Sequence, residues 1–399
     1  MGGTPDLLIV GASGRAAAMS AVRAGFRPWV VDLFGDEDLR ELAHEHRLIR
    51  DYGKVFAAIA DWPWMPWLGT GAIENHPGLI RRISKDRPFW GNSAGVMELV
   101  RNPSVLATTL TKAGCPSLAI WQDDTPPPPD GEWMLKPLHS AGGQGVFIWN
   151  QETAGSQAAE LTLNRPHYFQ ERAVGEGVSA VFLSDKRETS LIGISRLLLA
   201  NDPTSQFGYG GMIGPVKLPG SAEGQITRQG EVVGKSFGLR GLWGMDFIED
   251  GSTAWATEVN PRYTASVEIY EYATGVPLLS EHRRAFETPQ KDFRNELQPN
   301  ADSLKPTLVG KVVVYAERDL IIPPWGDWPT KRDAFLPELP TLADRPSEGS
   351  RVPRGFPICS LLAAAESENS CRRELNTILA DFAAHFRQAG WEISLPSLQ

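Results

Sequence analysis

The sequence predicts a mixed fold class, with an α/β part first, an antiparallel α+β part next and a small β-rich part last. Strands and helices alternate from the N-terminus. Hairpin-like strands joined by a glycine-rich turn follow a proline run at residues 126–129. A further strand, a Pro-rich segment and a helix close the chain, whose 399 residues fit two or three domains.

The first elements form a strand–helix–strand unit. Residues 7–10 are apolar and predict a buried strand, and an Ala-rich helix is expected over residues 15–24. Gly25 ends that helix, and residues 28–32 predict a second strand. This spacing favours a right-handed βαβ unit, so we expect a parallel sheet.

The α/β pattern continues to about residue 115. Residues 67–71 end another alternation, helices are expected at 77–84 and 104–112, and the segment 92–100 continues the α/β pattern between them. Gly114 closes the last of these helices.

The middle of the chain predicts antiparallel strands. Residues 133–137 and 146–149 flank a glycine-rich turn at 140–145. Residues 168–171 and 179–183 supply two more strands, which makes this an α+β region.

The last part begins after a polar stretch at 286–306, which we expect to be a linker with helical character. Residues 309–316 predict a strand, residues 323–357 are rich in proline, and a terminal helix is expected over 372–389.

Composition excludes several classes of function. A formal charge of −9 without any Lys/Arg-rich run argues against a nucleic-acid or membrane-surface role. No apolar run approaches the length of a membrane span. The three cysteines form no CxxC and cannot all pair, so we expect a reducing, cytoplasmic location.

The most informative stretch carries three oxygen ligands. Glu258 and Asn260 are two residues apart, so on a strand both face the same side. Asp246 precedes them across a turn at 249–253, and a turn centred near Ser252 would place it opposite Glu258. Two carboxylates and an amide oxygen suit a hard divalent cation that also holds phosphates. An acidic edge hairpin is the alternative.

A second motif is suited to anion binding. Lys136 precedes the segment SAGGQG, whose glycines let backbone N–H groups turn toward anionic oxygens. The lysine can add a positive charge at the phosphates. An ordinary hairpin with an exposed lysine is the alternative, and the segment is not a Walker loop, since it lacks G-K-[ST].

The order of these segments resembles the ATP-grasp superfamily, which includes D-alanine–D-alanine ligase and biotin carboxylase. A strand with Lys136 and a glycine loop is followed by Gln170-Glu171-Arg172-Ala173-Val174-Gly175-Glu176-Gly177, then by M-D-F and E-V-N-P-R. The resemblance covers about residues 115–287. It implies a Rossmann-like N-terminal domain at 1–115, a two-lobed ATP-grasp domain at 116–290, and a small β-rich C-terminal module at 305–399.

The resemblance also implies ligands and roles. ATP and Mg²⁺ would bind between the two lobes, with Arg262 stabilising phosphate or the acyl-transfer transition state. The phosphates would be held by Lys136 and the lid residues Ser140, Gly142, Gly143 and Gly145. Adenine would meet a hinge from Glu171 to Val174, and Mg²⁺ would be held by Asp246, Glu258 and Asn260.

Two positions depart from the family pattern. The acid that binds ribose in many members falls at Gly177, so Glu176 is the available substitute. A lysine before the first lobe is common in the family, whereas the nearest cation here is Arg101, which differs from lysine in geometry.

The activity implied is a Mg-ATP-dependent ligase that joins a small-molecule carboxylate to an amine through an acyl phosphate. An ATP-dependent carboxylase-like enzyme and a non-catalytic ATP-binding regulatory protein are the alternatives. No nucleic-acid or membrane partner is expected, and a homodimer is compatible with this assignment. A dehydrogenase is disfavoured, because Gly11-x-x-Gly14 lacks the G-x-G-x-x-G spacing.

Several other features allow two interpretations each. The Trp cluster at residues 62–67 favours core packing over substrate stacking. Residues 207–211 predict a loop that either lines the acceptor site or only turns the chain. His139 is expected on the surface, Cys359 is expected to be a buried inert thiol, and the tail loosely resembles the carboxylase branch.

Overall fold

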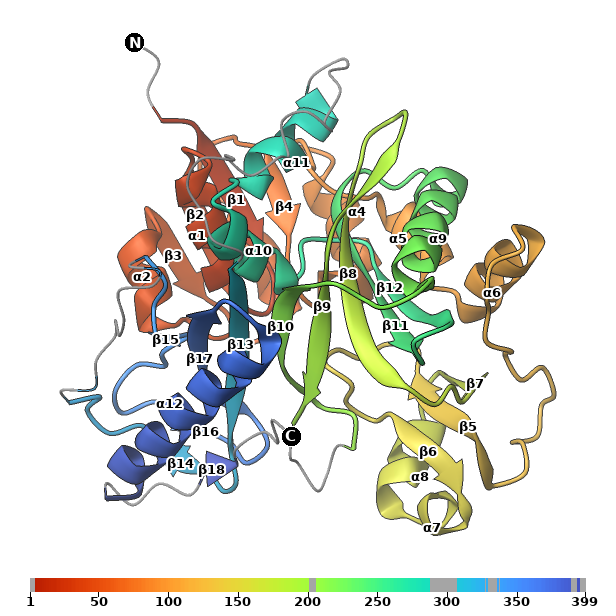
Figure 1. Cartoon of the computed structure of the whole chain (residues 1–399). Coiled ribbons are helices and arrows are strands. Elements are labelled where there is room, and N and C mark those ends of the chain that lie inside the picture. Colours follow the sequence, from red (N-terminus) through yellow and green to blue (C-terminus); the bar gives the residue numbers. More distant parts are fainter. Residues whose placement is uncertain are drawn as a thin grey trace.

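The computed structural model describes residues 4–200, 206–287, 307–326, 328, 336, 338–388 and 393–394. Four sheets, one of which has only two strands, organise these residues (Figure 1). Most of the linker expected at residues 286–306 lies outside the described part of the chain.

The N-terminal part is a parallel sheet of order β3-β2-β1-β4. Its strands are β1 (Asp6–Val10), β2 (Arg27–Asp32), β3 (Glu45–Leu48) and β4 (Trp67–Gly69). Its helical segments are α1 (Arg15–Arg23), α2 (Glu37–Leu42), η1 (Tyr52–Lys54), α3 (Val55–Ala58), η2 (Ile73–Asn75), α4 (Pro77–Ile83), α5 (Ala94–Val100) and α6 (Pro103–Lys112). The expected βαβ unit is confirmed, and Gly25 and Gly114 follow helices α1 and α6 with positive φ.

A small antiparallel sheet of order β6-β5-β7 forms one side of the central region. Its strands are β5 (Asp130–Pro137), β6 (Phe147–Asn150) and β7 (His167–Glu171), with helices α7 (Gln151–Ala154) and α8 (Gln157–Leu163). Its own core contains Leu135, Trp149 and Phe169. This sheet stands apart from the larger one in Figure 1.

The largest sheet has nine strands, eight of them in the order β12-β11-β8-β9-β10-β13-β17-β15, with β18 beside β13. The strands are β8 (Glu176–Ser184), β9 (Thr189–Leu199), β10 (Tyr209–Val216), β11 (Gly241–Glu249), β12 (Ala254–Asn260), β13 (Leu308–Ala316), β15 (Leu342–Ala343), β17 (Pro357–Ala365) and β18 (Ile393–Ser394). Strands β14 (Leu320–Ile321) and β16 (Arg351–Val352) pair separately. The helices are α9 (Ala222–Phe237), α10 (Ser266–Thr274), α11 (Leu278–Glu287) and α12 (Glu368–Gln388).

Apolar side chains that alternate along β8 are buried on both faces of this sheet. Phe182 packs with residues of α9, whereas Val181 and Leu183 pack in a cluster that includes residues of α1, α10 and α11. Successive side chains of a strand point to opposite faces, so one strand serves two cores. The N-terminal part is thereby attached to the large sheet through apolar contacts.

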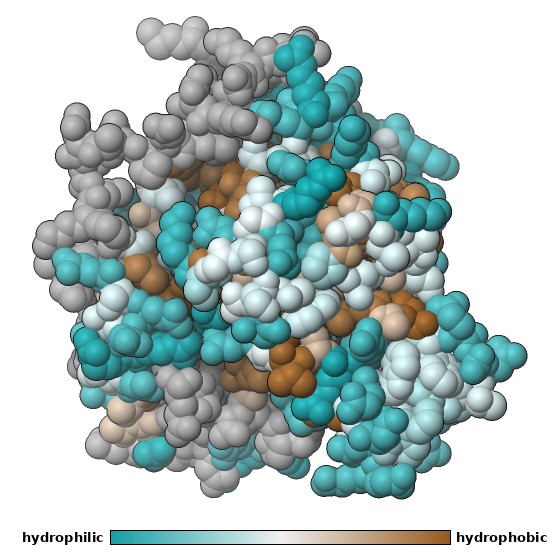
Figure 2. Space-filling view, turned by 45° about the vertical axis from the view of Figure 1, so that its right-hand side comes forward, coloured by the Kyte–Doolittle hydropathy of each residue, from teal (hydrophilic) through white to brown (hydrophobic). Residues whose placement is uncertain are grey.

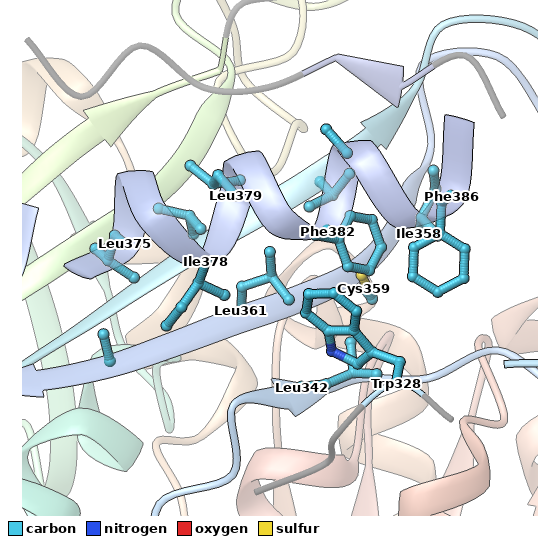
Figure 3. Packing of buried hydrophobic residues seen from close by; sticks show 14 of the residues in the cluster. Trp328, Leu342, Ile358, Cys359, Leu361, Leu375, Ile378, Leu379, Phe382 and Phe386 are labelled. Atoms are coloured by element: carbon cyan, nitrogen blue, oxygen red, sulfur yellow. The ribbon is translucent and has the colours of Figure 1, made fainter. Parts of the chain in front are cut away.

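The C-terminal strands continue the large sheet, because β13 pairs with β10 in an antiparallel register. Helix α12 covers β17, where Leu361, Phe382 and Trp328 lie in one apolar cluster (Figure 3). The expected C-terminal module therefore has its own core but shares its sheet with the central region. The domain boundaries themselves stay a prediction.

Most of the expected elements are present. The terminal helix begins at Glu368, earlier than the expected residue 372, and Cys359 is buried as expected. In the tryptophan cluster, Trp62 and Trp67 lie in the core, whereas Trp64 is 69 % exposed. Hydrophilic residues cover much of the described surface in Figure 2, with apolar residues in scattered patches. None of the described helices has the length and apolarity needed to cross a membrane.

Candidate active site

A cavity of about 1630 Å³ lies where the three parts of the chain meet. Its lining includes Lys136 from the small sheet, Asp246 from the large sheet, and Ser13 from the N-terminal part. All but one of the site residues expected from the sequence line this cavity. They are Arg101, Lys136, Ser140, Gly142, Gly143, Glu171, Val174, Glu176, Asp246, Glu258, Asn260 and Arg262, and Gly145 alone lies outside its lining.

Asp246 and Glu258 are directly opposite each other on β11 and β12, as the position of the turn predicted. Burial raises the pKa of Asp246 to about 8, and the neighbouring Glu258 carboxylate adds to the rise. Burial alone would raise the pKa of Glu258, but Lys136 and a hydrogen bond from Asp246 lower it. A proton shared by two adjacent carboxyl groups occupies the place where a cation would bind. Carboxylate oxygens are the ligands that a hard divalent cation prefers.

Asn260 completes this group of three. Its Nδ2 donates to Asp246 Oδ2 at 3.1 Å and to Glu258 Oε1 at 3.4 Å, and its Oδ1 accepts from Arg262. The oxygen and nitrogen of an Asn amide are assigned from their hydrogen bonds. With a cation bound, a half-turn of the Asn260 amide would bring its oxygen to face the two carboxylates. No group of three His, Cys, Asp or Glu side chains that could hold a metal ion occurs among the described residues, so a metal here would use the amide oxygen.

Arg262 is held by an acid from the N-terminal part. Its Nε donates to both oxygens of Glu74 at 3.0 Å, and its Nη2 lies 3.0 Å from Glu74 Oε1. Burial alone would lower the pKa of Arg262, but Glu74 raises it. Glu74 was missed by the sequence analysis, because it lies 188 residues from Arg262 in a segment without any recognisable motif.

Lys136 links the two sheets that flank the cavity. Its Nζ donates to Gln170 Oε1 on β7 and to the backbone oxygen of Thr257 on β12, both at 3.1 Å. Burial alone would lower the pKa of Lys136, but Tyr168 and Glu258 raise it. The ammonium group is therefore charged and close to the carboxylate pair.

Arg101 also reaches this end of the cavity. Its Nη1 donates to Asn75 Oδ1 at 2.8 Å, and its positive charge lowers the pKa of Glu258. The arginine that takes the place of the family's lysine thus lies near the carboxylates.

The glycine-rich loop packs on the segment before β10. Gly142, Gly143 and Gly145 have φ values of 64°, 75° and 76°, which side-chain-bearing residues rarely adopt. The Gly142 oxygen accepts from Tyr209 N at 3.0 Å. A Cβ on Gly143 would lie 1.8 Å from the Phe207 oxygen, so this contact requires glycine.

The expected adenine hinge joins β7 of the small sheet to β8 of the large sheet. Glu171 Oε2 accepts from Ala119 N at 2.9 Å, and Val174 is 72 % exposed although it is apolar. Glu176, the expected substitute for the ribose acid, forms an ion pair of 2.7 Å with Arg196. An exposed valine beside an acid offers apolar and polar contact to a ligand in the cavity.

Two further sequence features have clear positions. Phe207 and Tyr209 line the cavity, as one of the two interpretations of this loop required. His139 is exposed, as expected.

A buried group of charges adjoins the same cavity, which two of its members, Lys311 and Asp344, line, and this group was not foreseen. Arg15 donates to both oxygens of Glu268, and its Nε donates to Asp344 at 2.8 Å. Lys311 Nζ lies 3.2 Å from Glu268 and 3.0 Å from Asp344. These four residues are spread from α1 to β15, and no local motif announces their contact.

Comparison with known proteins gives a family and a fold. Residues 105–266 match the ATP-grasp domain family. No curated protein matches in sequence. The described fold resembles several solved structures that are 14 or 15 % identical in sequence, a level at which only the fold is shown.

Three of these structures illustrate the likeness. The biotin carboxylase domain of Hydrogenobacter thermophilus 2-oxoglutarate carboxylase, with MgADP and bicarbonate, has a TM-score of 0.70 at 14 % identity and covers 100 % of this chain and 92 % of its own. Campylobacter jejuni biotin carboxylase in complex with β-γ-ATP has a TM-score of 0.70 at 15 % identity. The match covers 98 % of this chain and 92 % of that protein. Bacillus licheniformis L-amino acid ligase has a TM-score of 0.66 at 14 % identity, and the match covers 95 % of this chain and 98 % of that protein.

The motif order, the family match and the fold agree on one assignment. Residues 105–266 of the chain form an ATP-grasp domain, within a fold that resembles those of the solved structures above.

Proposed function

We propose that this protein is a Mg-ATP-dependent ligase that joins a small carboxylic acid to an amine. The observation that carries the proposal is the position of Lys136, whose Nζ reaches from the small sheet to Thr257 beside the Asp246–Glu258 pair. A cation and a carboxylate pair thereby face one cavity from two sheets. This arrangement suits a triphosphate whose charge is shared between Lys136 and a metal ion.

The donor chemistry fits magnesium. Asp246, Glu258 and the Asn260 amide would supply oxygen ligands, and the raised pKa of Asp246 is expected of a carboxylate pair without a cation between its members. When bound, Mg²⁺ would neutralise phosphate charge during phosphoryl transfer. Arg262, fixed by Glu74, is placed to support the same charge from the other side of Asn260.

The reaction would have two steps. A carboxylate oxygen of the acid takes the γ-phosphoryl group of ATP, which gives an acyl phosphate and ADP. The amine nitrogen then attacks the acyl carbon, the C–O bond to phosphate breaks, and the amine loses a proton. Lys136 and Arg262 reduce the repulsion between the two anions of the first step, and the glycine loop covers the phosphates and limits water.

Nucleotide binding tests the site without knowledge of the acceptor. Glu258→Gln should weaken Mg-ATP binding at least ten-fold in a calorimetric titration, whereas Glu98→Gln, which changes an exposed acid paired with Arg81, should not. Glu258→Ala should also abolish ADP release while the fold survives. Unchanged Mg-ATP affinity and ADP release in the Glu258 variants would refute the proposal.

A carboxylase-like activity is the second candidate. Two observations favour it. The C-terminal strands continue the large sheet, and the structural match to a biotin carboxylase domain covers the whole of this chain. Bicarbonate would then be the acid that is phosphorylated. An ADP-release assay with bicarbonate in one arm and amino acids in the other separates the candidates.

Location and assembly are part of the proposal. The three free cysteines support a reducing cytoplasm. A homodimer is supported by the dimer of the 2-oxoglutarate carboxylase domain, and light scattering on a sizing column would test it.

A further inference from the structure

The cavity continues from the carboxylate pair toward the N-terminal part, where it is lined by Asp36, Lys311 and Asp344. We call this region the inner arm. Tyr209 lines the same cavity, and the charges of Asp246 and of Glu268 and Asp344 all raise the pKa of its hydroxyl. The inner arm is thus placed for the part of a substrate that does not react.

Asp36 has no partner in the inner arm. Its side chain is only 4 % exposed, yet it lines the cavity, and no described residue donates a hydrogen bond or forms an ion pair with its carboxyl group. Buried carboxyl groups are almost always paired, because loss of hydration is costly. An unpaired one that faces a cavity indicates that a ligand group completes it.

The cations nearby are already used. Arg15 is bound by Glu268 and Asp344, and Lys311 lies within 3.2 Å of the same two acids. Asp38, 3.7 Å from Arg15, also accepts two backbone N–H groups. Four carboxyl groups, those of Asp36, Asp38, Glu268 and Asp344, therefore lie around two buried cations, so acids outnumber cations in the inner arm.

The electrostatic environment of Asp36 agrees with this count. Burial raises the pKa of Asp36 well above its usual value, and the acids Asp344, Asp38 and Asp32 raise it further, while Arg15 opposes them. A cationic ligand would relieve both effects. An anionic ligand there would meet four acids, whereas the two buried cations, Arg15 and Lys311, are already paired with Glu268 and Asp344.

A second unpaired group supports a ligand at this place. The hydroxyl of Tyr209 is buried without a hydrogen-bond partner, and Tyr209 lines the same cavity. Its acceptor lone pairs and its donor are both available to a ligand that passes from the inner arm toward Asp246.

We propose that the inner arm binds an ammonium group of the substrate, with Asp36 as its carboxylate partner and the Tyr209 hydroxyl beside it. The inference rests on the proposed function, which makes this cavity the substrate site, and it assigns the substrate class. The substrate is a small molecule that carries an ammonium group, as an amino acid does. Asp36 is a specificity-determining residue that takes no part in phosphoryl transfer.

The test uses matched pairs of probes on the full-length protein. Binding of the twenty L-amino acids and of their N-acetyl derivatives is measured by calorimetry, with and without a non-hydrolysable Mg-ATP analogue. The proteins are wild type, Asp36→Asn and the control Glu37→Gln, which alters the adjacent acid outside the cavity lining. Unfolding temperatures verify that the variants fold.

We expect at least one amino acid to bind the wild type, at least ten-fold more tightly than its N-acetyl form. Asp36→Asn should lose at least ten-fold in affinity for it, and Glu37→Gln should change less than two-fold. The proposal is overturned if no amino acid binds, if the N-acetyl form binds equally, or if Asp36→Asn binds as the wild type does. Nucleotide binding by the Glu258 variants is a separate readout. A failure of the ligase assignment is therefore distinguishable from a failure of the ammonium site.

Discussion

Glu74 holds Arg262 through three contacts of 3.0 Å, so an acid from the N-terminal part fixes a cation of the ATP-grasp domain. Both side chains are largely buried, at 2 % and 13 % exposure. A buried ion pair of this kind fixes geometry more than it adds stability, but removing one partner is costly. The orientation of Arg262 therefore depends on how the N-terminal part docks.

Glu74→Gln should disturb Arg262 while leaving the nucleotide hinge intact. We expect ADP release to fall at least ten-fold and the free energy of unfolding to drop by about 3 kcal/mol, because the Arg262 charge loses its partner. Steady-state kinetics and urea unfolding provide the measurements. Glu98→Gln serves as the control, and equal activity in the two variants would contradict the assignment.

Lys136→Gln should affect phosphate binding selectively. The loss of the ammonium charge beside Glu258 should weaken ATP by at least ten-fold and adenosine by less than two-fold. Calorimetric titrations with both ligands measure the ratio. Lys217→Gln, at a lysine that is 90 % exposed, is the control. A uniform loss for both ligands would point to misfolding instead.

Gly143→Ala should displace the glycine-rich loop. The added Cβ would lie 1.8 Å from the Phe207 oxygen at a residue with φ of 75°, so either the loop or the Phe207 segment must move. We expect weaker ATP binding with little change in the unfolding temperature, because the loop lies outside the described apolar clusters.

Gly224→Ala provides the contrasting control. This helical glycine has open space around a Cβ, so alanine should stabilise the protein by up to about 1 kcal/mol and leave ATP binding unchanged. Equal ATP affinities for Gly143→Ala and the wild type would show that the loop does not cover the nucleotide.

His282 predicts a loss of stability in acid. Its Nδ1 accepts from Leu242 N at 2.8 Å and its Nε2 donates to the Trp90 oxygen at 2.9 Å, and burial lowers its pKa to about 4. The unfolded chain binds this proton near the ordinary value of 6.5, so the unfolded state takes up more protons between pH 6.5 and 4. Stability from His282 is therefore present above pH 6.5 and is lost as the pH falls.

The size of this effect follows from the shift. A fall from 6.5 to about 4 corresponds to about 3 kcal/mol over the whole window. Urea unfolding of the wild type and His282→Asn between pH 4 and 7.5 would measure it. The difference in unfolding free energy between them should shrink toward acid, and a difference independent of pH would exclude His282 as the cause.

Local patterns predicted those parts of the site that are close in sequence. Asp246 and Glu258 were placed opposite each other because a short turn fixes the register of two strands. Lys136 and the glycine loop were found because strand, lysine and glycines follow one another. The sheet order and the shared cavity could not be predicted, since they depend on how distant segments pack.

Contacts over long distances in the chain left no trace in the sequence. Arg15 meets Asp344 across 329 residues, and Arg262 meets Glu74 across 188. An isolated Asp or Glu is ordinary on a surface, so nothing marks Asp36 or Glu74 before the fold brings their neighbours. The sequence also did not show that β13 and β17 extend the large sheet.

The antiparallel pairing of β10 with β13 has a consequence for shortening this chain. A truncation before residue 307 would leave β10 as an outer strand, with free N–H and C=O groups along Gly211–Gly214 and with Ile213 uncovered. Such an open edge readily adds a strand from a neighbouring molecule. The matched region expressed without the tail should therefore precipitate, and solubility should return only when β13 and β17 are retained.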